Sequence, residues 1–317
     1  MVHRLSLDEA RGAWTALAEA SPLATPFAAW AALDAAQAHF GRATVLLVEE
    51  HGRPVAGAAL FLRRLFGARV ALSPPLTFDA PVLLATLPDA ARVHARTSVL
   101  DTLAAAVEAE ARVVLWTLPP GLADARPLRW RGWTTSLLYT YVLSLSGEDD
   151  VMARWSAGTR RRYARDRAAL DVREDVAAAP EIGALLAARY AEQGKRLMPH
   201  GAGLDGYVRA LIDAGVARLW AARDRQGDVA GGLVVLRHGA RAHYWLAASR
   251  PGPAMTCLVG EACQALRAEG VTAFDLGGAN TPSIAEFKRR LGASLVPYVR
   301  AVAARPRLLA LHPALRP

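Results

Sequence analysis

A single lysine near the end of the chain is the side chain best suited to chemistry. Segment Phe274–Gly292 reads FDLGGANTPSIAEFKRRLG and contains Lys288, one of only two lysines among 38 basic residues. A compact ammonium on a flexible stem can stabilise an oxyanion or a phosphate as a point charge, whereas arginine brings a broad planar fork. Because arginine is used almost everywhere else, the retained lysine indicates a catalytic role. An exposed helix lysine without function is the alternative.

The residues before Lys288 predict a strand that ends in a tight turn. The apolar strand reaches Asp275, a candidate catalytic carboxylate, and Gly277 and Gly278 let the backbone pass closely by a ligand or a helix. A plain strand-to-helix turn is the alternative. Asn280 is a candidate for substrate binding, and the candidate caps of the next helix are Asn280, Thr281 and Ser283.

After this turn we expect a short helix that carries Lys288 near the rim of its buried face. The residues expected to point inward are Ile284, Phe287 and Leu291. With Lys288 at the rim, replacing it should hardly change the stability of the protein, because a rim-exposed lysine contributes little to folding.

Three arginines mark a second candidate site. Segment Trp155–Leu170 predicts a helix with Thr159 as its N-cap. At about 100° per residue, one arc of that helix holds Arg161, Arg162 and Arg165. Three guanidinium groups on one arc suit a diphosphate or an RNA backbone, so we take them as candidate substrate-binding residues. A solvated basic face is the alternative.

The net charge is unevenly distributed along the chain. The total is +9, of which residues 1–146 carry +1 and residues 147–317 carry +8. An anionic ligand of the second half would account for this difference, and the classes we consider are a phosphate-bearing substrate, tRNA and a membrane surface. The second lysine, Lys195, lies in an irregular segment after a predicted helix, which is typical of substrate-binding loops and of ordinary connectors.

The alternating segment HYWLAAS predicts a strand that borders a site. Its period of two places His243 and Trp245 on one face and Tyr244 on the other. Tyr244 is a candidate general acid or hydrogen-bonding partner of the acceptor. Trp245 is a candidate substrate contact, although core packing is the commoner role. His243 is a candidate base.

The composition describes a soluble globular protein of two domains. The chain has 317 residues, of which 53% are hydrophobic and 21% charged, and no apolar run approaches the roughly 20 residues of a membrane-spanning helix. Its start lacks the apolar core of a signal peptide. Cys257 and Cys263 lie in one predicted helix and are expected to be buried small residues. We therefore expect a cytoplasmic protein without a transmembrane segment.

The chain contains an internal repeat. Thr44–Leu62 matches Arg218–Leu236, and both predict a β-hairpin whose second strand opens with Val-Ala-Gly. Each half then continues with a helix, a strand and a last strand. We expect two α/β domains with mixed, mostly antiparallel sheets flanked by helices. The N-terminal domain would span residues 1–146, and residues 147–317 would form a C-terminal domain that contains the basic linking helix and the active site.

This order resembles the GNAT acyltransferase fold in tandem, as found in the Fem family. The resemblance rests on the repeat, on HYWLAAS and FDLGGAN, and on EFKRRLGASLVPY, and it covers nearly the whole chain. Fem enzymes transfer amino acids from aminoacyl-tRNA to peptidoglycan precursors, and related proteins are described as acetyltransferase-like. The resemblance implies that Lys288, which matches the lysine of the family's Phe-Lys motif, lies in the acyl-transfer site. It also implies a basic segment after the first domain, where Arg162 and Arg165 lie.

Two departures leave the donor open. The long helical hairpin that many Fem enzymes carry in the second domain has no counterpart, which lowers the expectation of tRNA as the donor. The segment expected to cradle coenzyme A, Ser249–Thr256, has prolines at 251 and 253 that remove two amide donors.

We therefore expect an N-acyltransferase without a tightly bound cofactor, with acyl-CoA or aminoacyl-tRNA as the donor substrate. The acceptor would be an amine, on a small molecule or on a cell-envelope precursor. Because no nucleophile or metal motif is present, the acceptor amine would attack the activated acyl group directly. The alternatives are an acyl-CoA-dependent acetyltransferase of a small or sugar amine, and a non-enzymatic protein that binds nucleic acid or anionic lipid at a peripheral membrane surface.

Overall fold

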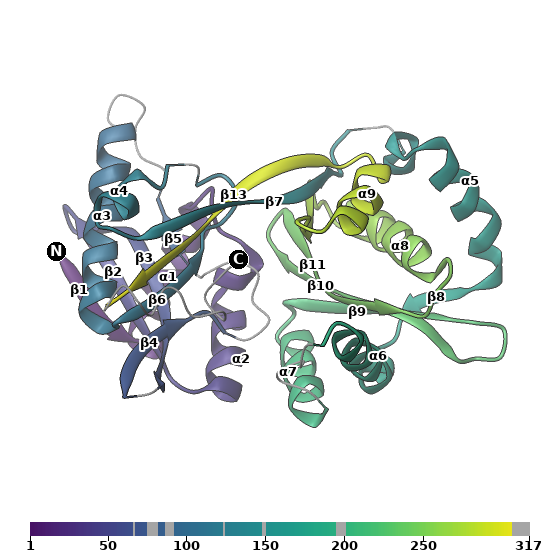
Figure 1. Ribbon diagram of the computed structural model, residues 1–317, viewed down its shortest axis with the longest axis horizontal. Coiled ribbons are helices and arrows are strands. Elements are labelled where there is room, and N and C mark those ends of the chain that lie inside the picture. The colour runs from purple at the N-terminus through teal and green to yellow at the C-terminus, as the bar shows by residue number, and fades with distance from the viewer. Residues whose placement is uncertain are drawn as a thin grey trace. The chain divides into compact units, whose positions relative to one another are not determined.

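The chain forms two compact units in a computed structural model (Figure 1). The structure describes residues 1–65, 67–74, 82–85, 92–122, 124–147, 150–194 and 201–305. The first unit comprises Met1–Leu138 together with Pro297–Pro317, and the second comprises Tyr139–Val296. The domain boundary near residue 146 that the repeat suggests stays a prediction. The predicted site residue Lys195 lies outside the described residues.

The first unit has a sheet whose described strands follow the order β1-β2-β3-β4-β6-β13, with β5 paired to β3. The elements that begin in this unit are β1 (Val2–Ser6), α1 (Leu7–Ala20), α2 (Trp30–Phe40), β2 (Ala43–Glu50), β3 (Arg53–Leu65), β4 (Ala68–Leu72), β5 (Val82–Leu84), α3 (Arg92–Glu110), β6 (Val113–Thr117), α4 (Arg126–Trp130) and β7 (Thr134–Ser144).

The second unit has a sheet of order β7-β12-β11-β10-β9-β8, to which β7 contributes its C-terminal half. Its further elements are α5 (Ala157–Asp166), β8 (Asp171–Glu174), α6 (Ala179–Glu192), α7 (Ala202–Asp213), β9 (Ala217–Arg223), β10 (Val229–His238), β11 (Arg241–Ser249), α8 (Ala254–Ala268), β12 (Ala273–Gly278), α9 (Pro282–Arg290) and β13 (Ser294–Ala304), whose C-terminal half pairs with β6 in the first unit.

The predicted fold class is confirmed. The described strand pairs are antiparallel except β4 with β6 and β11 with β12, which hold equivalent positions in the two units. Both expected hairpins are present, β2 with β3 and β9 with β10. The first turns through His51 and Gly52, both at positive φ, and such a two-residue turn matches the twist of the flanking strands. The second closes at Gly227, where Asp224 accepts the backbone N–H groups of Gln226 and Asp228.

Helices cover both faces of the sheet in the second unit (Figure 1). On β10, Leu233 and Val235 pack with α8 in one apolar cluster, whereas Val234 between them faces α6 and α7. This alternation is the period of two expected for a strand that is buried on both sides. Cys257 and Cys263 are both free and buried in α8, as the sequence predicted. Among the described residues, no helix is both long and apolar enough to cross a membrane.

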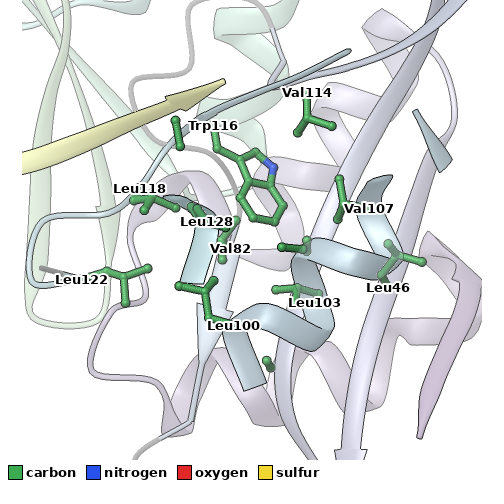
Figure 2. Close-up of a cluster of buried hydrophobic side chains, with 14 of the residues drawn as sticks. Leu46, Val82, Leu100, Leu103, Val107, Val114, Trp116, Leu118, Leu122 and Leu128 are labelled. Carbon is green, nitrogen blue, oxygen red and sulfur yellow. The ribbon is translucent and has the colours of Figure 1, made fainter. Parts of the chain in front are cut away.

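The core of the first unit is an apolar cluster around Trp116 (Figure 2). Figure 2 shows Leu118 and Leu128 beside this indole. The side chains of all three are at most 3% exposed, and Trp116 also stacks at a tilt on Trp133 with 5.2 Å between the ring centroids. Residues from β6, from the segment that follows it and from α4 therefore meet in this core.

The turn that ends α9 is packed tightly on the segment that precedes α5. Gly292 has φ +72°, and a Cβ atom added to it would lie 2.3 Å from the carbonyl oxygen of Arg154. Next to it, the N–H of Ser156 donates to the carbonyl of Arg290 at 2.8 Å. Ser156 is also the N-cap of α5, in place of the predicted Thr159, which is buried in the first turn. The position of α5 therefore depends on the end of α9.

Replacing Gly292 with alanine should destabilise the second unit by more than the cost of placing alanine at a positive φ angle. Gly270 is the matched control, because it also follows a helix at positive φ (+81°) but has no atom within 4 Å of an added Cβ. We expect Gly270→Ala to lower the free energy of unfolding by about 1 kcal/mol. Gly292→Ala should lower it by at least about 2 kcal/mol more, because the methyl group collides with a backbone carbonyl. Denaturant unfolding measures both, and equal losses would contradict the contact.

Candidate active site

The candidate site lies where two parallel strands separate. β11 and β12 pair from Arg241 with Ala273 to His243 with Asp275. Beyond this point β12 pairs with β7 on its other side, through Gly278 and Thr140, while β11 continues beside β10. Backbone groups at the ends of separating strands can receive an extended ligand, and ligands of open α/β sheets commonly bind at such openings.

Strand β11 contains a β-bulge at its two aromatic residues, Tyr244 and Trp245. Val234 of β10 pairs with Leu246 and Val235 pairs with Tyr244, so Trp245 is the additional residue. The hydroxyl of Tyr244 donates to the sulfur of Met255 in α8 at 3.1 Å.

Trp245 packs edge-to-face on Tyr207 of α7, with 5.6 Å between the ring centroids. Trp245 therefore lies on the opposite face of the sheet from Tyr244, as strand alternation predicts. Because of the bulge, Leu246 faces α6 and α7 on this same side.

Lys288 is buried near the point where β11 and β12 separate. The prediction of a rim position was wrong, since Lys288 is 6% exposed while Ile284, expected to point inward, is 44% exposed. The Nζ atom donates to the carbonyls of Gly277 at 2.9 Å and Gly278 at 2.7 Å, and it lies 5.7 Å from the centroid of the Tyr244 ring. These two carbonyls use two of the three donors of the ammonium.

The sequence pattern failed here because the two strand-end carbonyls provide acceptors for a buried charge. A helical wheel contains no information about them. Because Lys288 is buried and not at the rim, replacing it should lower the stability of the protein, contrary to the expectation from the sequence. The loss of the ammonium would leave two carbonyls without their donor.

Asp275 is held in the same cluster by Thr140. Its Oδ1 atom accepts the Thr140 hydroxyl at 2.5 Å and the N–H of Gly277 at 2.8 Å. The Thr140 hydroxyl also lies 2.7 Å from the carbonyl oxygen of Gly277, which accepts from Lys288 as well. On the other side, Oδ2 of Asp275 lies 4.0 Å from Nδ1 of His243. The side chains of Thr140, His243, Asp275 and Lys288 therefore surround the backbone turn at Gly277.

Burial controls the protonation of these groups. It lowers the pKa of Lys288 to about 8, although the carboxylate of Asp275 acts in the opposite direction. Burial also lowers the pKa of His243 to about 4, against the same carboxylate, so this imidazole is neutral near pH 7. The pKa of Tyr244 is raised by burial, which keeps its hydroxyl protonated. Neither His243 nor Tyr244 is thus poised to exchange a proton near neutral pH.

A second feature of the unit is a pocket of about 320 Å³ at the N-terminus of α8. Arg162 and Arg165 of α5 line it together with Gly252, Pro253 and Thr256. No side chain caps this end of the helix, and its first turn has no acidic residue. The two prolines of the preceding segment lie before α8 begins at Ala254, so the amides of the first turn are retained. Such a helix end favours an anion.

The predicted site residues therefore fall into separate groups. Tyr244, Asp275, Gly277 and Gly278 meet at Lys288. Arg161 is exposed and does not line the pocket that Arg162 and Arg165 share. The side chain of Asn280 is bonded to the backbone of Tyr139, where its Oδ1 accepts the N–H at 3.0 Å, and it does not cap α9.

Sequence reasoning missed Thr140. It is fully buried, but it belongs to β7 and lies 135 residues from Asp275. Its neighbours in the sequence form an ordinary strand, so no local signal could have identified it.

The corresponding region of the first unit is apolar. Gly132 follows α4 as Gly292 follows α9, both at positive φ. Counting four residues back places Leu128 at the position of Lys288. Leu128 is fully buried in the cluster of Figure 2, beside Trp116 at the end of β6. Where the second unit has a buried ammonium, the first has an apolar contact.

Comparison with known proteins identifies the second unit and the overall fold. Residues 153–289 match the acetyltransferase (GNAT) domain family. The solved structure of FemX superposes with a TM-score of 0.70 at 12% identity, and the match covers 94% of this chain and 96% of that chain. No curated protein matches the sequence.

Two further solved structures share the fold. L-PGS from Bacillus licheniformis has a TM-score of 0.54 at 14% identity, over 87% of each chain. A tandem GNAT protein from the clavulanic acid biosynthesis pathway has a TM-score of 0.55 at 18% identity, over 96% of this chain and 98% of that one. The second unit therefore contains a region that matches the GNAT acetyltransferase domain, and the chain as a whole shares the fold of FemX and of the tandem GNAT protein.

Proposed function

We propose that the chain transfers an acyl group from a phosphate-bearing activated donor to the amine of an acceptor, at the opening between β11 and β12. The observation that carries this proposal is the buried ammonium of Lys288, held at the strand ends by two backbone carbonyls. A positive charge fixed by the protein's own groups can stabilise a negative charge that develops beside it during a reaction.

The proposed reaction is a direct displacement at the acyl carbon. The neutral amine attacks the carbonyl, a C–N bond forms, and the carbonyl oxygen becomes an oxyanion that Lys288 stabilises. The bond between the carbonyl carbon and the leaving group then breaks. The leaving group departs with the proton that the amine loses, so the products are an amide and a thiol or hydroxyl compound.

The pocket at α8 is the proposed site for the donor's phosphate. The charge of Arg162 and the free end of α8 support a diphosphate or an RNA backbone there. Arg165 is paired in the same pocket with Asp166, to which it donates two hydrogen bonds. GNAT domains typically use acyl-CoA as a substrate, and the name of the clavulanic acid relative refers to AcCoA. The resemblance to the Fem family supports the alternative donor, aminoacyl-tRNA, and an acceptor in the cell envelope, either soluble or at a membrane surface.

The donor class can be determined by direct transfer. The protein is incubated with acetyl-CoA or with aminoacyl-tRNA, together with a panel of primary amines and amino sugars, and amide products are measured by mass spectrometry. We expect amide formation with one of the two donors. If neither donor yields an amide, and neither raises the melting temperature, the proposed function is wrong.

Replacing Arg162 should weaken binding of the donor. Arg161 is the matched control, because it is exposed on the same helix but does not line the pocket. Loss of a charge-assisted contact costs about 1.5–3 kcal/mol, so Arg162→Ala should raise the Kd of the donor at least about tenfold. Arg161→Ala should change it by less than about threefold. Titration calorimetry measures both, and equal effects would mean that only the general charge of α5 matters.

Replacing Lys288 should impair turnover rather than binding. Lys288→Met keeps most of the volume and removes the charge, so kcat should fall by about 10²–10³-fold, as for the loss of one oxyanion donor. Lys288→Arg should not restore the rate, because a planar guanidinium does not reproduce the compact point charge that the carbonyls of Gly277 and Gly278 hold.

The pH profile of kcat provides the control for the charge of Lys288. Since only the ammonium stabilises the oxyanion, the parent should lose activity as the pH rises through about 8. Lys288→Met should lack this loss. A parent rate that does not fall across this range would contradict the assigned role.

A further inference from the structure

We propose that Asp275, anchored by Thr140, is a positioning residue that keeps Lys288 protonated and in place, and is not the base of the reaction. This inference rests on the proposed role of Lys288 in acyl transfer.

Both carboxylate oxygens of Asp275 face groups of the protein itself. Oδ1 receives the Thr140 hydroxyl and the N–H of Gly277, and Thr140 is fully buried. Oδ2 faces His243 across 4.0 Å. A carboxylate whose oxygens are directed at the protein's own groups is poorly placed to accept a proton from an incoming amine.

Asp275 is connected to Lys288 through the carbonyl of Gly277. Thr140 has one hydroxyl proton and two nearby acceptors, Oδ1 of Asp275 and the carbonyl oxygen of Gly277. That same carbonyl oxygen accepts from Nζ of Lys288. The Gly277 turn is therefore fixed from both sides, by the acid through its N–H and by the lysine through its carbonyl.

Among the described groups that surround Lys288, Asp275 supplies the negative charge that acts on the ammonium. β11 contributes the neutral imidazole of His243 and the Tyr244 ring, and β7 contributes the hydroxyl of Thr140. On its own helix, Glu286 is bonded to its neighbours, Arg289 and Arg290, on the exposed side.

Without the carboxylate of Asp275, no other described group would offset the effect of burial, which lowers the pKa of Lys288. Burial lowers the pKa of Lys288 to about 8 even with Asp275 present. An opposite charge nearby shifts a pKa by about 1–3 units. Removal of the carboxylate should therefore leave Lys288 largely neutral at physiological pH, with no charge for the oxyanion.

The scarcity of lysine makes a direct measurement possible. The chain has only Lys195 and Lys288, so protein labelled with ¹³C at lysine Cε gives two side-chain signals. A Lys195→Arg variant assigns them. The pH midpoint of the Lys288 signal is then measured in the parent, in Asp275→Asn and in Glu286→Gln, on full-length protein without substrate.

The expected result separates the two carboxylates. Asp275→Asn should lower the midpoint of Lys288 by roughly one pH unit or more, because the amide keeps the shape and hydrogen-bonding oxygen but not the charge. Glu286→Gln, two residues from Lys288 but exposed, should leave it within about 0.3 units of the parent. An unchanged midpoint in Asp275→Asn, or an equal shift in both variants, would overturn the inference.

A charge-retaining variant covers the case in which Asp275→Asn does not fold. Asp275→Glu should keep the midpoint of Lys288 at or above the parent value, and a fall in this variant overturns the inference as well. Transfer assays separate the inference from the proposed function. If the midpoint falls in Asp275→Asn while kcat at pH 7 is unchanged, the inference stands and the catalytic role of Lys288 is wrong.

Discussion

The burial of one ammonium is the constraint on which the second unit depends. Lys288 is held by the carbonyls of Gly277 and Gly278, at the end of a strand that has just separated from its neighbour. Two strands that stayed paired would use those carbonyls in the sheet. The separation of β11 and β12 therefore does two things at once, because it frees acceptors for the buried charge and opens the backbone to a ligand.

The comparison of the two units shows what this constraint requires. Both have a pair of parallel strands, a helix and a last strand in the same order, yet the first unit has Leu128 and Trp116 in an apolar core. An apolar core is the less demanding solution, since it needs no partners for a buried charge. The second unit retains a costly polar cluster, and such clusters are commonest where function maintains them.

Much of the fold could be predicted from the sequence, and less of the site. The repeated hairpins follow from strand alternation and turn residues, both local signals. Lys288 stood out by its rarity, but its burial did not, since its partners are backbone carbonyls. The role of Thr140 was invisible because β7 joins the cluster from far along the chain. The bulge at Trp245 also escaped prediction, because it appears only when β11 pairs with β10.

The central claim is that Lys288 contacts the reacting carbonyl. The most direct test is a crystal structure with a non-hydrolysable analogue of whichever donor supports transfer, in which a methylene group replaces the scissile sulfur or oxygen. The account predicts that the carbonyl oxygen of the analogue lies within hydrogen-bonding distance of Nζ of Lys288, between β11 and β12. An acyl carbonyl bound elsewhere, with Nζ still donating only to Gly277 and Gly278, would contradict it.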